Sequence, residues 1–339
     1  MRWDAIWYSN HPLSYALLPL AWLFCAVVRL RRVLYRWKIL PSYRPAVPVI
    51  IVGNLSVGGT GKTPLVIWIA QFLKAQGFKP AIISRGYKGE ATTYPQAVRP
   101  DSDPKVVGDE PILLARHGAC PVAVAPQRIL AVQALLAHHD CDVIISDDGL
   151  QHYALQRDIE IAVVDGERRY GNRRCLPAGA LREPVSRLRE VDFIVTKGMA
   201  GSHEYAMQYE SKVLTNLQNP ELNEALTAWR GRSVHAVAGI GHPERFFNRL
   251  RDLGLKVQPH IFPDHHAYQA QDLQFTDGLP VIMTEKDAVK CRLFVGENAW
   301  YLPITARLPA PFGEKLLQLL HKRNHDGQKT LRNSGVSRH

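Results

Sequence analysis

Cysteine is scarce and scattered in this chain. Among 339 residues there are five cysteines, and no two form a C-x-x-C pair. Paired spacing of this kind is typical of structural zinc sites, and dense cysteine frameworks are typical of small secreted domains. The sequence therefore indicates neither a zinc site nor a disulfide scaffold, and it fits a protein of the reducing cytosol. The five positions are Cys25, Cys120, Cys141, Cys175 and Cys291.

Charge is missing from one long stretch near the N-terminus. Residues 5–28 contain no Asp, Glu, Lys or Arg, and a basic segment follows at once from Arg29 to Lys38. A spanning helix needs about 20 apolar residues, but Pro12 and Pro19 interrupt this stretch. We expect residues 1–40 to form a membrane-associated helix that lies in, or partly crosses, one leaflet with its arginines on anionic headgroups. The alternative is an apolar helix packed on the body of the protein or at a dimer interface.

Acidic residues are too few to balance the basic ones, and the formal net charge is +11. The excess of Lys and Arg is concentrated in residues 1–41 and 322–339, so the body of the protein is nearly neutral. A nucleic-acid partner would instead require a basic patch on the folded body. We therefore expect no nucleic-acid partner, and we expect the polar, basic tail 323–339 to be disordered.

A glycine-rich turn follows the apolar segment 48–52. The pattern Gly-Gly-Thr-Gly-Lys-Thr at 58–63 predicts a phosphate loop, because backbone N–H groups at a helix N-terminus stabilise phosphate oxygens. Lys62 would reach the β- and γ-phosphates of ATP, and the Thr63 hydroxyl would bind Mg²⁺. The usual spacing has a glycine where Ser56 stands, and we expect the first two glycines of the pattern to supply the backbone freedom. The residues predicted to bind the nucleotide are Ser56, Val57, Gly58, Gly59, Thr60, Gly61, Lys62 and Thr63.

Short apolar runs alternate with amphipathic stretches after Pro41, which predicts an α/β fold. We expect a P-loop NTPase-type parallel sheet domain over 41–205 and a second, smaller α/β lid domain over 206–322, with 201–232 mostly helical. Strands are expected at 48–53, 79–84, 121–125, 142–147, 159–165 and 191–196, and in the smaller domain at 233–239, 256–262, 280–284 and 299–304. Helices are expected at about 63–76, 110–117, 127–138, 243–253, 269–274 and 312–322.

Two neighbouring carboxylates end the apolar strand expected at 142–147. A buried strand that delivers Asp147 and Asp148 beside a phosphate loop is typical of a Mg²⁺ site, and one of them would hold the metal directly or through water. Helix capping is the alternative for both. Asp109 opens the helix expected at about 110–117, and there the residues alone leave a catalytic base and an N-cap equally open.

Arginines also lie at strand ends or in loops, where the planar guanidinium suits phosphate groups of a substrate. The residues assigned to substrate binding in this way are Arg85, Arg128 and Arg182. In the smaller domain, Asp264-His265-His266 favours a histidine held by an aspartate over a metal cluster. The segment Glu285-Lys286-Asp287 is faintly similar to the base-binding loop of GTPases, or it is a turn.

Together these motifs resemble one family, the tetraacyldisaccharide 4'-kinases of Gram-negative lipid A biosynthesis. The resemblance covers nearly the whole chain, including the apolar N-terminus and the loop in which Ser56 replaces glycine. Its motifs are V-G-N-L-S-V-G-G-T-G-K-T at 52–63, S-R-G-Y at 84–87, G-D-E-P at 108–111, D-D-G-L-Q-H at 147–152, L-P-A-G-A-L-R-E-P at 176–184, D-H-H-A-Y at 264–268 and T-E-K-D-A-V-K at 284–290.

The resemblance implies that ATP, with Mg²⁺, donates its γ-phosphate to the 4'-hydroxyl of a tetraacyl glucosamine disaccharide 1-phosphate. It implies that Asp109 is the catalytic base, with His265 as its partner and Lys62 as a further catalytic group. It places Asp147 and Asp148 near Mg²⁺ and Arg182 near the substrate or the phosphates. It also implies a location at the cytoplasmic face of the inner membrane, with no obligate protein partner.

Two other functions share parts of this pattern. A membrane-associated NTPase switch uses the same phosphate loop and strand-end aspartates, but it releases free phosphate. An ATP-dependent ligase on a similar fold is the second alternative. The fate of the γ-phosphate in the presence of a lipid acceptor distinguishes a kinase from both.

Overall fold

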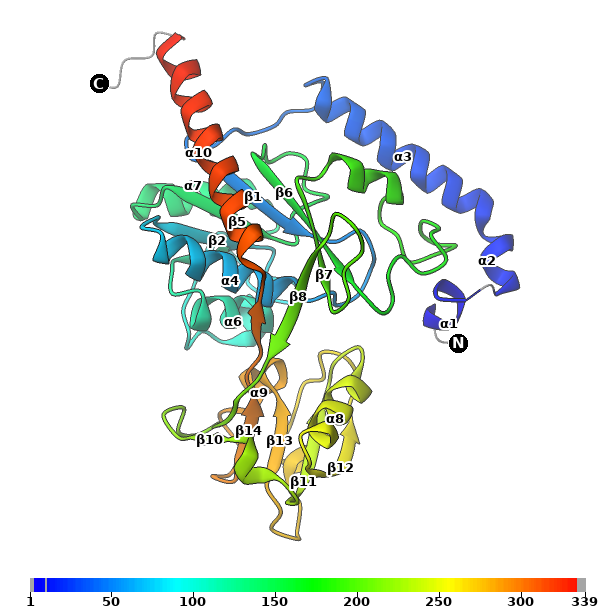
Figure 1. Cartoon of the computed structure of the whole chain (residues 1–339), viewed down its shortest axis with the longest axis vertical. Coiled ribbons are helices and arrows are strands. Elements are labelled where there is room, and N and C mark those ends of the chain that lie inside the picture. The colour runs from blue at the N-terminus through cyan, green and yellow to red at the C-terminus, as the bar shows by residue number, and fades with distance from the viewer. Residues whose placement is uncertain (1–2, 10, 334–339) are drawn as a thin grey trace.

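The computed structural model describes residues 3–9 and 11–333, with side chains as far as Arg323. Two α/β units lie one above the other, each built around its own sheet, and helices of the N-terminal segment lie along the outside of the larger unit (Figure 1). The chain therefore forms the predicted α/β fold, with a larger and a smaller unit.

The larger sheet has nine strands in the order β15-β8-β7-β6-β1-β5-β2-β4-β3. The seven strands from β8 to β4 run parallel, and β15 and β3 add antiparallel edges. The strands are β1 Val49–Gly53, β2 Pro80–Ser84, β3 Gln96–Val98, β4 Val122–Val124, β5 Val143–Asp147, β6 Ile159–Asp165, β7 Phe193–Lys197, β8 Tyr205–Glu210 and β15 Thr305–Arg307. The phosphate loop leaves the central strand, β1.

The two faces of the larger sheet carry separate cores, because successive residues of a strand point to opposite faces. On β1, Ile50 and Val52 belong to one core with Leu65 and Phe312, whereas Val49 and Ile51 belong to the other. All five residues of β1 and of β5 are buried. Strands that are buried on both faces have continuous apolar sequences. These apolar runs are the pattern from which β1 and β5 were predicted.

Helices cover both faces of this sheet. α4 and α10 pack on the first core, and α7 packs on the second. The helices of the larger unit are α4 Lys62–Ala75, α5 Pro104–Val107, α6 Asp109–His117, α7 Arg128–His138, η1 Val185–Glu190 and α10 Ala310–Asn333, and those of the N-terminal segment are α1 Trp3–Trp7, α2 Pro12–Ala16 and α3 Leu18–Arg36.

The smaller sheet has six strands in the order β10-β9-β14-β13-β11-β12. Its four strands from β14 to β12 are parallel, and β9 and β10 are antiparallel. The elements are β9 Val213–Asn216, β10 Asn223–Ala225, η2 Leu226–Trp229, β11 Ser233–Ala238, α8 Pro243–Asp252, β12 Lys256–Ile261, η3 Ala270–Leu273, β13 Val281–Thr284, α9 Glu285–Cys291 and β14 Ala299–Leu302. The predicted strands and helices of this unit lie within a few residues of these bounds, with η3 a 3₁₀ turn.

The segment 201–232 corrects one prediction, because it contains strands where helix was expected. β8 lengthens the larger sheet beside β7, and β9 pairs with β14 in the smaller one. In β8 the alternate residues Tyr205, Met207 and Tyr209 face the first core. The alternation of apolar residues in β8 covers only three positions, so it is a weak signal for a strand.

The C-terminal part also differs from the prediction. α10 continues to Asn333, so residues 323–333 are helical rather than disordered, and 334–339 lie outside the described residues. The expected boundary at 205/206 runs through β8, a strand of the larger sheet. β15 returns to that sheet beside β8, and Phe312 of α10 lies in its core. The larger unit therefore includes both ends of the predicted lid domain.

The N-terminal helices lie against the larger unit through one side only. Ala21 of α3 is buried, and Phe24 and Cys25 pack on the second core. The opposite side exposes Trp22, Leu23, Val27 and Leu30 together with Leu20. Within the described part of the chain, no helix combines the length and the apolar character needed to cross a membrane.

Candidate active site

The carboxyl ends of the parallel strands gather the polar groups of the larger unit at one edge of the sheet, where α/β proteins form their sites. β1 leads into the phosphate loop, β5 ends at Asp147, and β2 ends just before Arg85. The helix that follows β4 begins at Arg128. The strand order places β5 beside both β1 and β2, so these groups are neighbours.

The phosphate loop has a positive φ at two of its three glycines, and one of the two is the predicted Gly58. Gly58 and Gly61 have φ values of 98° and 91°, a region that side chains rarely adopt. A Cβ atom at Gly61 would also lie 2.0 Å from the hydroxyl of Tyr209. Gly59 has no positive φ, so the freedom expected of it is supplied by Gly58 and Gly61. α4 then begins at Lys62 and presents its free N–H groups at this loop.

Lys62 lies between two oxygen acceptors. Its Nζ donates to Asn54 Oδ1 at 3.1 Å and lies 3.4 Å from Asp148 Oδ1. Asn54 is fully buried, and its Nδ2 donates to the carbonyl of Ser56 at 2.7 Å. Asn54 thus ties the lysine to the loop backbone. No site role was predicted for Asn54, although it stands in the motif at 52–63.

Asp148 joins three of the predicted residues. Arg182 Nη1 donates to Asp148 Oδ1 at 3.1 Å, and Arg128 Nη2 donates to the Asp148 carbonyl at 3.3 Å. Burial alone would raise the pKa of Asp148, but the charges of Lys62 and Arg182 lower it below its ordinary value. Burial lowers the pKa of Arg128 to about 10, and that arginine still carries its charge at neutral pH.

Asp147 is the more buried of the two aspartates. Its side chain is almost wholly buried, Oδ2 accepts from Ser84 Oγ at 3.3 Å, and Oδ1 has no hydrogen-bond partner among the described residues. Burial, reinforced by the charge of Glu110, raises the pKa of Asp147 to about 7. An isolated buried carboxylate oxygen is costly, and a cation bound there removes that cost. The carboxylate oxygens of Asp147 and Asp148 fit Mg²⁺, which prefers oxygen ligands.

Asp109 and His265 meet across the junction of the two units. Asp109 is the first residue of α6 and is buried, and His265 follows β12 with a φ of 63°. His265 Nδ1 lies 3.2 Å from Asp109 Oδ2. Burial would raise the pKa of Asp109, but the hydrogen bond from His265 and the charge of Lys286 lower it below its ordinary value. The N-cap of α6 is Gly108, so Asp109 does not serve as that cap.

Lys286 and Glu110 complete this group and were not predicted as site residues. Lys286 Nζ lies 3.1 Å from Glu110 Oε1 and 3.3 Å from His265 Nε2. The sequence carried only a weak signal for the lysine, because Glu285-Lys286-Asp287 also fits a turn. Here Thr284 caps α9, its hydroxyl accepting from the Asp287 backbone N–H, and the helix directs Lys286 to the junction.

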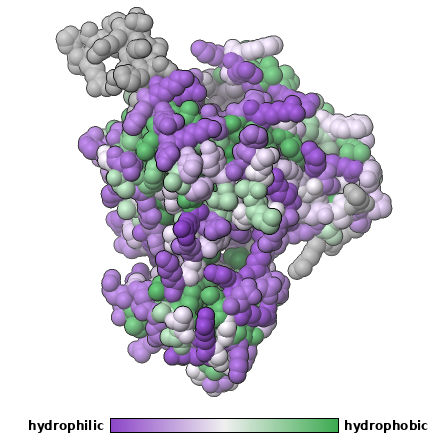
Figure 2. Space-filling view, in the orientation of Figure 1, coloured by the Kyte–Doolittle hydropathy of each residue, from purple (hydrophilic) through white to green (hydrophobic). Residues whose placement is uncertain are grey.

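A second contact joins the units beside the phosphate loop. Arg245 of α8 binds Asp165, at the end of β6, at 2.5 Å. The molecule narrows between the larger and the smaller unit, and its surface is hollowed there (Figure 2). The carboxyl edges of the two parallel sheets therefore face one another across the hollow.

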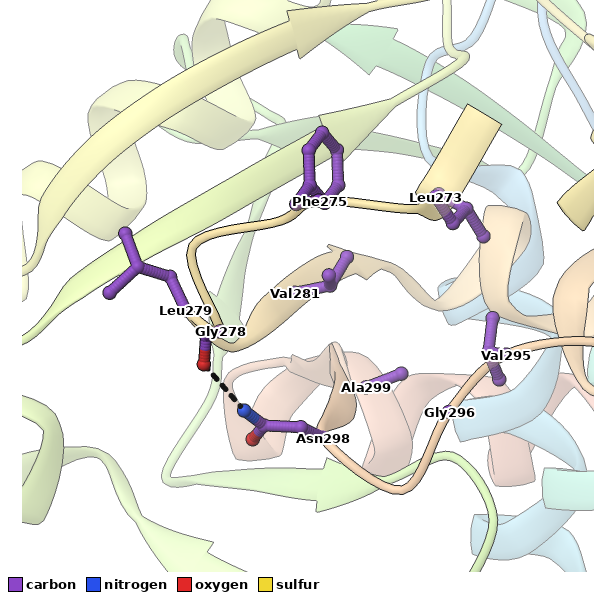
Figure 3. A pocket seen from close by; sticks show the side chains of 9 residues that line it. All are labelled: Leu273, Phe275, Gly278, Leu279, Val281, Val295, Gly296, Asn298 and Ala299. Atoms are coloured by element: carbon purple, nitrogen blue, oxygen red, sulfur yellow. Dashed lines mark hydrogen bonds between the residues drawn. The ribbon is translucent and has the colours of Figure 1, made fainter. Parts of the chain in front are cut away.

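Arg85 is exposed and takes part in none of the ion pairs of the described residues. A separate hollow of about 190 Å³ lies in the smaller unit (Figure 3). Its lining includes Val281 and Ala299, the first residues of β13 and β14, so it opens at the opposite end of that sheet from Thr284. It is not part of this site.

Known proteins resemble this chain over most of its length. The family model for tetraacyldisaccharide-1-P 4'-kinase matches residues 13–321. Tetraacyldisaccharide 4'-kinases from Nitrosococcus oceani and Alkalilimnicola ehrlichii are 54% and 50% identical over 316 and 326 residues, which cover 93% and 95% of this chain and 93% and 97% of theirs. A crystal structure of LpxK from Aquifex aeolicus in complex with ATP superposes with a TM-score of 0.78 at 31% identity, over 91% of this chain and 99% of that one.

The match spans the phosphate loop, the strand-end aspartates and the Asp109–His265 pair alike. It also confirms the P-loop NTPase-type α/β fold predicted from the sequence. The chain belongs to the tetraacyldisaccharide-1-P 4'-kinase family.

Proposed function

We propose that this chain transfers the γ-phosphate of ATP to the 4'-hydroxyl of a tetraacylated glucosamine disaccharide 1-phosphate, a step of lipid A biosynthesis. The family and its ATP-bound relative support the activity and the nucleotide. The observation that carries the assignment of roles is the 3.2 Å contact between Asp109 and His265 at the junction that the phosphate loop faces.

The larger unit binds the nucleotide. The loop backbone and Lys62 hold the β- and γ-phosphates, since charge neutralisation and positioning supply most of the acceleration in phosphoryl transfer. Thr63, Asp147 and Asp148 are the residues that would hold Mg²⁺, with Asp147 Oδ1 as the best-suited atom because it is buried without a partner in the described structure. Bound Mg²⁺ supplies charge neutralisation at the phosphate oxygens.

Asp109 removes the proton of the attacking hydroxyl. Its carboxylate is ionised at neutral pH, because the nearby His265 and Lys286 keep its pKa low. A base must lie within hydrogen-bond reach of the proton that it removes, and Asp109 lies at the start of α6, where the two units meet. The smaller unit excludes water from the transferring group, which limits hydrolysis of ATP.

The three arginines have different roles in this proposal. Arg182 holds the Asp148 carboxylate beside Lys62, Arg128 holds the Asp148 backbone carbonyl, and both add positive charge near the phosphates. Arg85 is exposed at the end of β2 and is free to bind a phosphate or hydroxyl group of the acceptor.

The location in this proposal is the cytoplasmic face of the inner membrane, where ATP is present, and the exposed apolar side of α3 supports it. The apolar residues Leu20, Leu23, Val27 and Leu30 follow one side of α3 at helical spacing and are exposed. Exposed arginines continue the helix and suit anionic headgroups. An in-plane helix of this kind fits an acceptor whose acyl chains stay in the bilayer.

A short path connects these helices with the phosphate loop. Ser14 of α2 donates to the Ala178 carbonyl at 2.6 Å, and Arg168 pairs with Asp4 at 2.7 Å. From the same segment, the Ala180 carbonyl accepts from the Val57 backbone N–H at 2.8 Å. The segment 168–182 therefore touches both the N-terminal helices and the loop, which keeps the site close to the membrane surface.

The test is the fate of the γ-phosphate. Purified chain is incubated with γ-labelled ATP, Mg²⁺ and vesicles that contain the tetraacyl disaccharide 1-phosphate. We expect label in the lipid, and an acceptor whose 4'-hydroxyl is blocked should remain unlabelled. Release of all label as free phosphate would contradict the kinase assignment and favour an NTPase.

A further inference from the structure

In the mechanism above Lys286 only helps to keep the pKa of Asp109 low, yet it contacts both members of the Asp109–His265 pair. It lies in the first turn of α9 in the smaller unit, and its side chain is 20% exposed. Its Nζ lies 3.1 Å from Glu110 Oε1, 3.3 Å from His265 Nε2 and 3.9 Å from Asp109 Oδ2. One ammonium group thus contacts two residues of α6 and one residue of its own unit.

These contacts define the proton position on His265. A lysine ammonium only donates hydrogen bonds, so His265 Nε2 must be the acceptor of the Lys286 contact. The single proton of the neutral imidazole then lies on Nδ1, from which it is donated to Asp109 Oδ2 at 3.2 Å. A proton on Nε2 would remove both hydrogen bonds at once. Lys286 and Asp109 therefore select the same tautomer from opposite sides of the ring.

The charges around Lys286 keep it protonated. Burial lowers its pKa, but Glu110, Asp109 and Asp264 outweigh burial and raise it above the ordinary value. The group around His265 also includes Lys290 on α9, which lowers the pKa of Asp109, and the edge of the Tyr87 ring. Lys286 is the only one of these groups that donates to the imidazole among the described contacts.

We propose that Lys286 is a positioning residue of the phosphate transfer, which fixes the Nδ1–H tautomer of His265 and orients the Asp109 carboxylate by bridging α9 and α6. This inference rests on the proposed function, because it takes Asp109 as the base. Lys286 itself touches no reacting atom. Its contacts with Glu110 and Asp109 exist only when the smaller unit lies against α6, so it links the position of that unit to the geometry of the base.

The first test compares Lys286→Met with Lys286→Arg and with Glu285→Gln. Glu285 is a matched control, since it joins the same two helices through His117 at 2.5 Å but does not touch His265. For Lys286→Met we expect kcat to fall roughly 10- to 100-fold, below the full contribution of a general base, with the KM for ATP little changed. The acidic limb of the pH–rate profile should move to higher pH, because loss of the positive charge raises the pKa of Asp109.

The two other variants separate positioning from mere contact. Lys286→Arg keeps a cation and donors, so it should restore the acidic limb to its wild-type position and recover part of kcat. Glu285→Gln should leave the limb unmoved. If Lys286→Met leaves the limb unmoved, or if Glu285→Gln moves it equally, Lys286 serves only to hold the units together and the inference is overturned.

The second test needs no variant and no turnover. Nitrogen NMR of the wild-type chain with labelled histidine, in which His265→Gln identifies the His265 signals, distinguishes the two neutral tautomers. We expect His265 to be protonated at Nδ1, and protonation at Nε2 would overturn the inference. A wild-type chain that labels no lipid would instead reject the proposed function, so the two failures are distinct.

Discussion

The carboxyl edges of the two parallel sheets contribute to the site in different ways. In the larger unit, Lys62, Asp148 and Arg182 find their partners within that unit. In the smaller unit, His265 and Lys286 find theirs on α6. The proposed nucleotide site is therefore assembled by one unit alone, whereas the arrangement around the proposed base, Asp109, exists only where both units meet.

The local structure explains this difference. β1 and β5 are central, wholly buried strands, so the residues at their ends are held by the core of the larger unit. His265 instead follows β12, an edge strand, and its backbone has a positive φ. A residue in such a loop depends on its contacts for its position. We expect substitutions in the two units to affect different steps for this reason.

The largest expected effect belongs to Asp109→Asn. This change removes the base but leaves the phosphate loop intact, so kcat should fall about 100- to 10,000-fold while the Kd for ATP stays close to that of the wild type. Steady-state kinetics and nucleotide titration measure the two quantities. Lys62→Met changes the phosphate loop of the larger unit, so it should weaken ATP binding as well as lower kcat. Unchanged kcat in Asp109→Asn would remove the base assignment.

A smaller effect concerns the membrane. If only the larger unit and its helices contact the bilayer, the double substitution Trp22→Ser and Leu30→Ser should lower vesicle binding roughly 100-fold, since each side chain contributes about 1.5–3 kcal/mol when buried. Leu293→Ser is the matched control, because Leu293 is 97% exposed but lies in the smaller unit. Vesicle co-sedimentation provides the measurement. Equal losses for both proteins would contradict a membrane face on α3.

The smallest effect is on stability and concerns the second contact between the units. Arg245→Leu leaves the buried Asp165 carboxylate with only the backbone N–H groups of Glu167 and Arg168 as partners, and it should lower the free energy of unfolding by about 2 kcal/mol at neutral pH. Burial raises the pKa of Asp165, but the hydrogen bond from Arg245 lowers it below the ordinary value. A lowered carboxylate pKa stabilises the fold above the unfolded pKa of about 3.9, and this contribution is lost as the pH falls through the folded pKa.

Urea unfolding of the wild type and of Arg245→Leu, at neutral pH and in acid, tests this sign. The difference in free energy of unfolding should shrink as the pH falls below about 4. A difference that stays constant, or grows in acid, would show that the ionised Asp165 is not what Arg245 stabilises.

The sequence predicted the larger unit's part of the site better than the part at the junction. Continuous apolar runs ending in glycine or aspartate mark β1 and β5, so the phosphate loop and the aspartates could be placed from local pattern. The pairing of Asp109 with His265 came from the family resemblance, because the two lie 156 residues apart and no periodicity links them. The role of Lys286 could not be predicted from the sequence, since only the contact between α9 and α6 reveals its partners.

The fold predictions failed where long-range pairing decides the structure. β8 and β15 are short strands whose place depends on each other and on β7. Neither has a strong local signal, so the boundary between the units was placed inside β8. The polar composition that predicted a disordered tail did not identify the continuation of α10 as far as Asn333.

The most direct test of a base arrangement shared by the two units is a double-mutant cycle between Asp109→Asn and His265→Gln, measured as kcat for lipid phosphorylation. Residues that act as one unit lose catalysis non-additively. We predict that the double variant is no slower than Asp109→Asn alone, because His265 acts through that carboxylate. If the two losses multiply, His265 acts independently of Asp109, and the account of the junction is wrong.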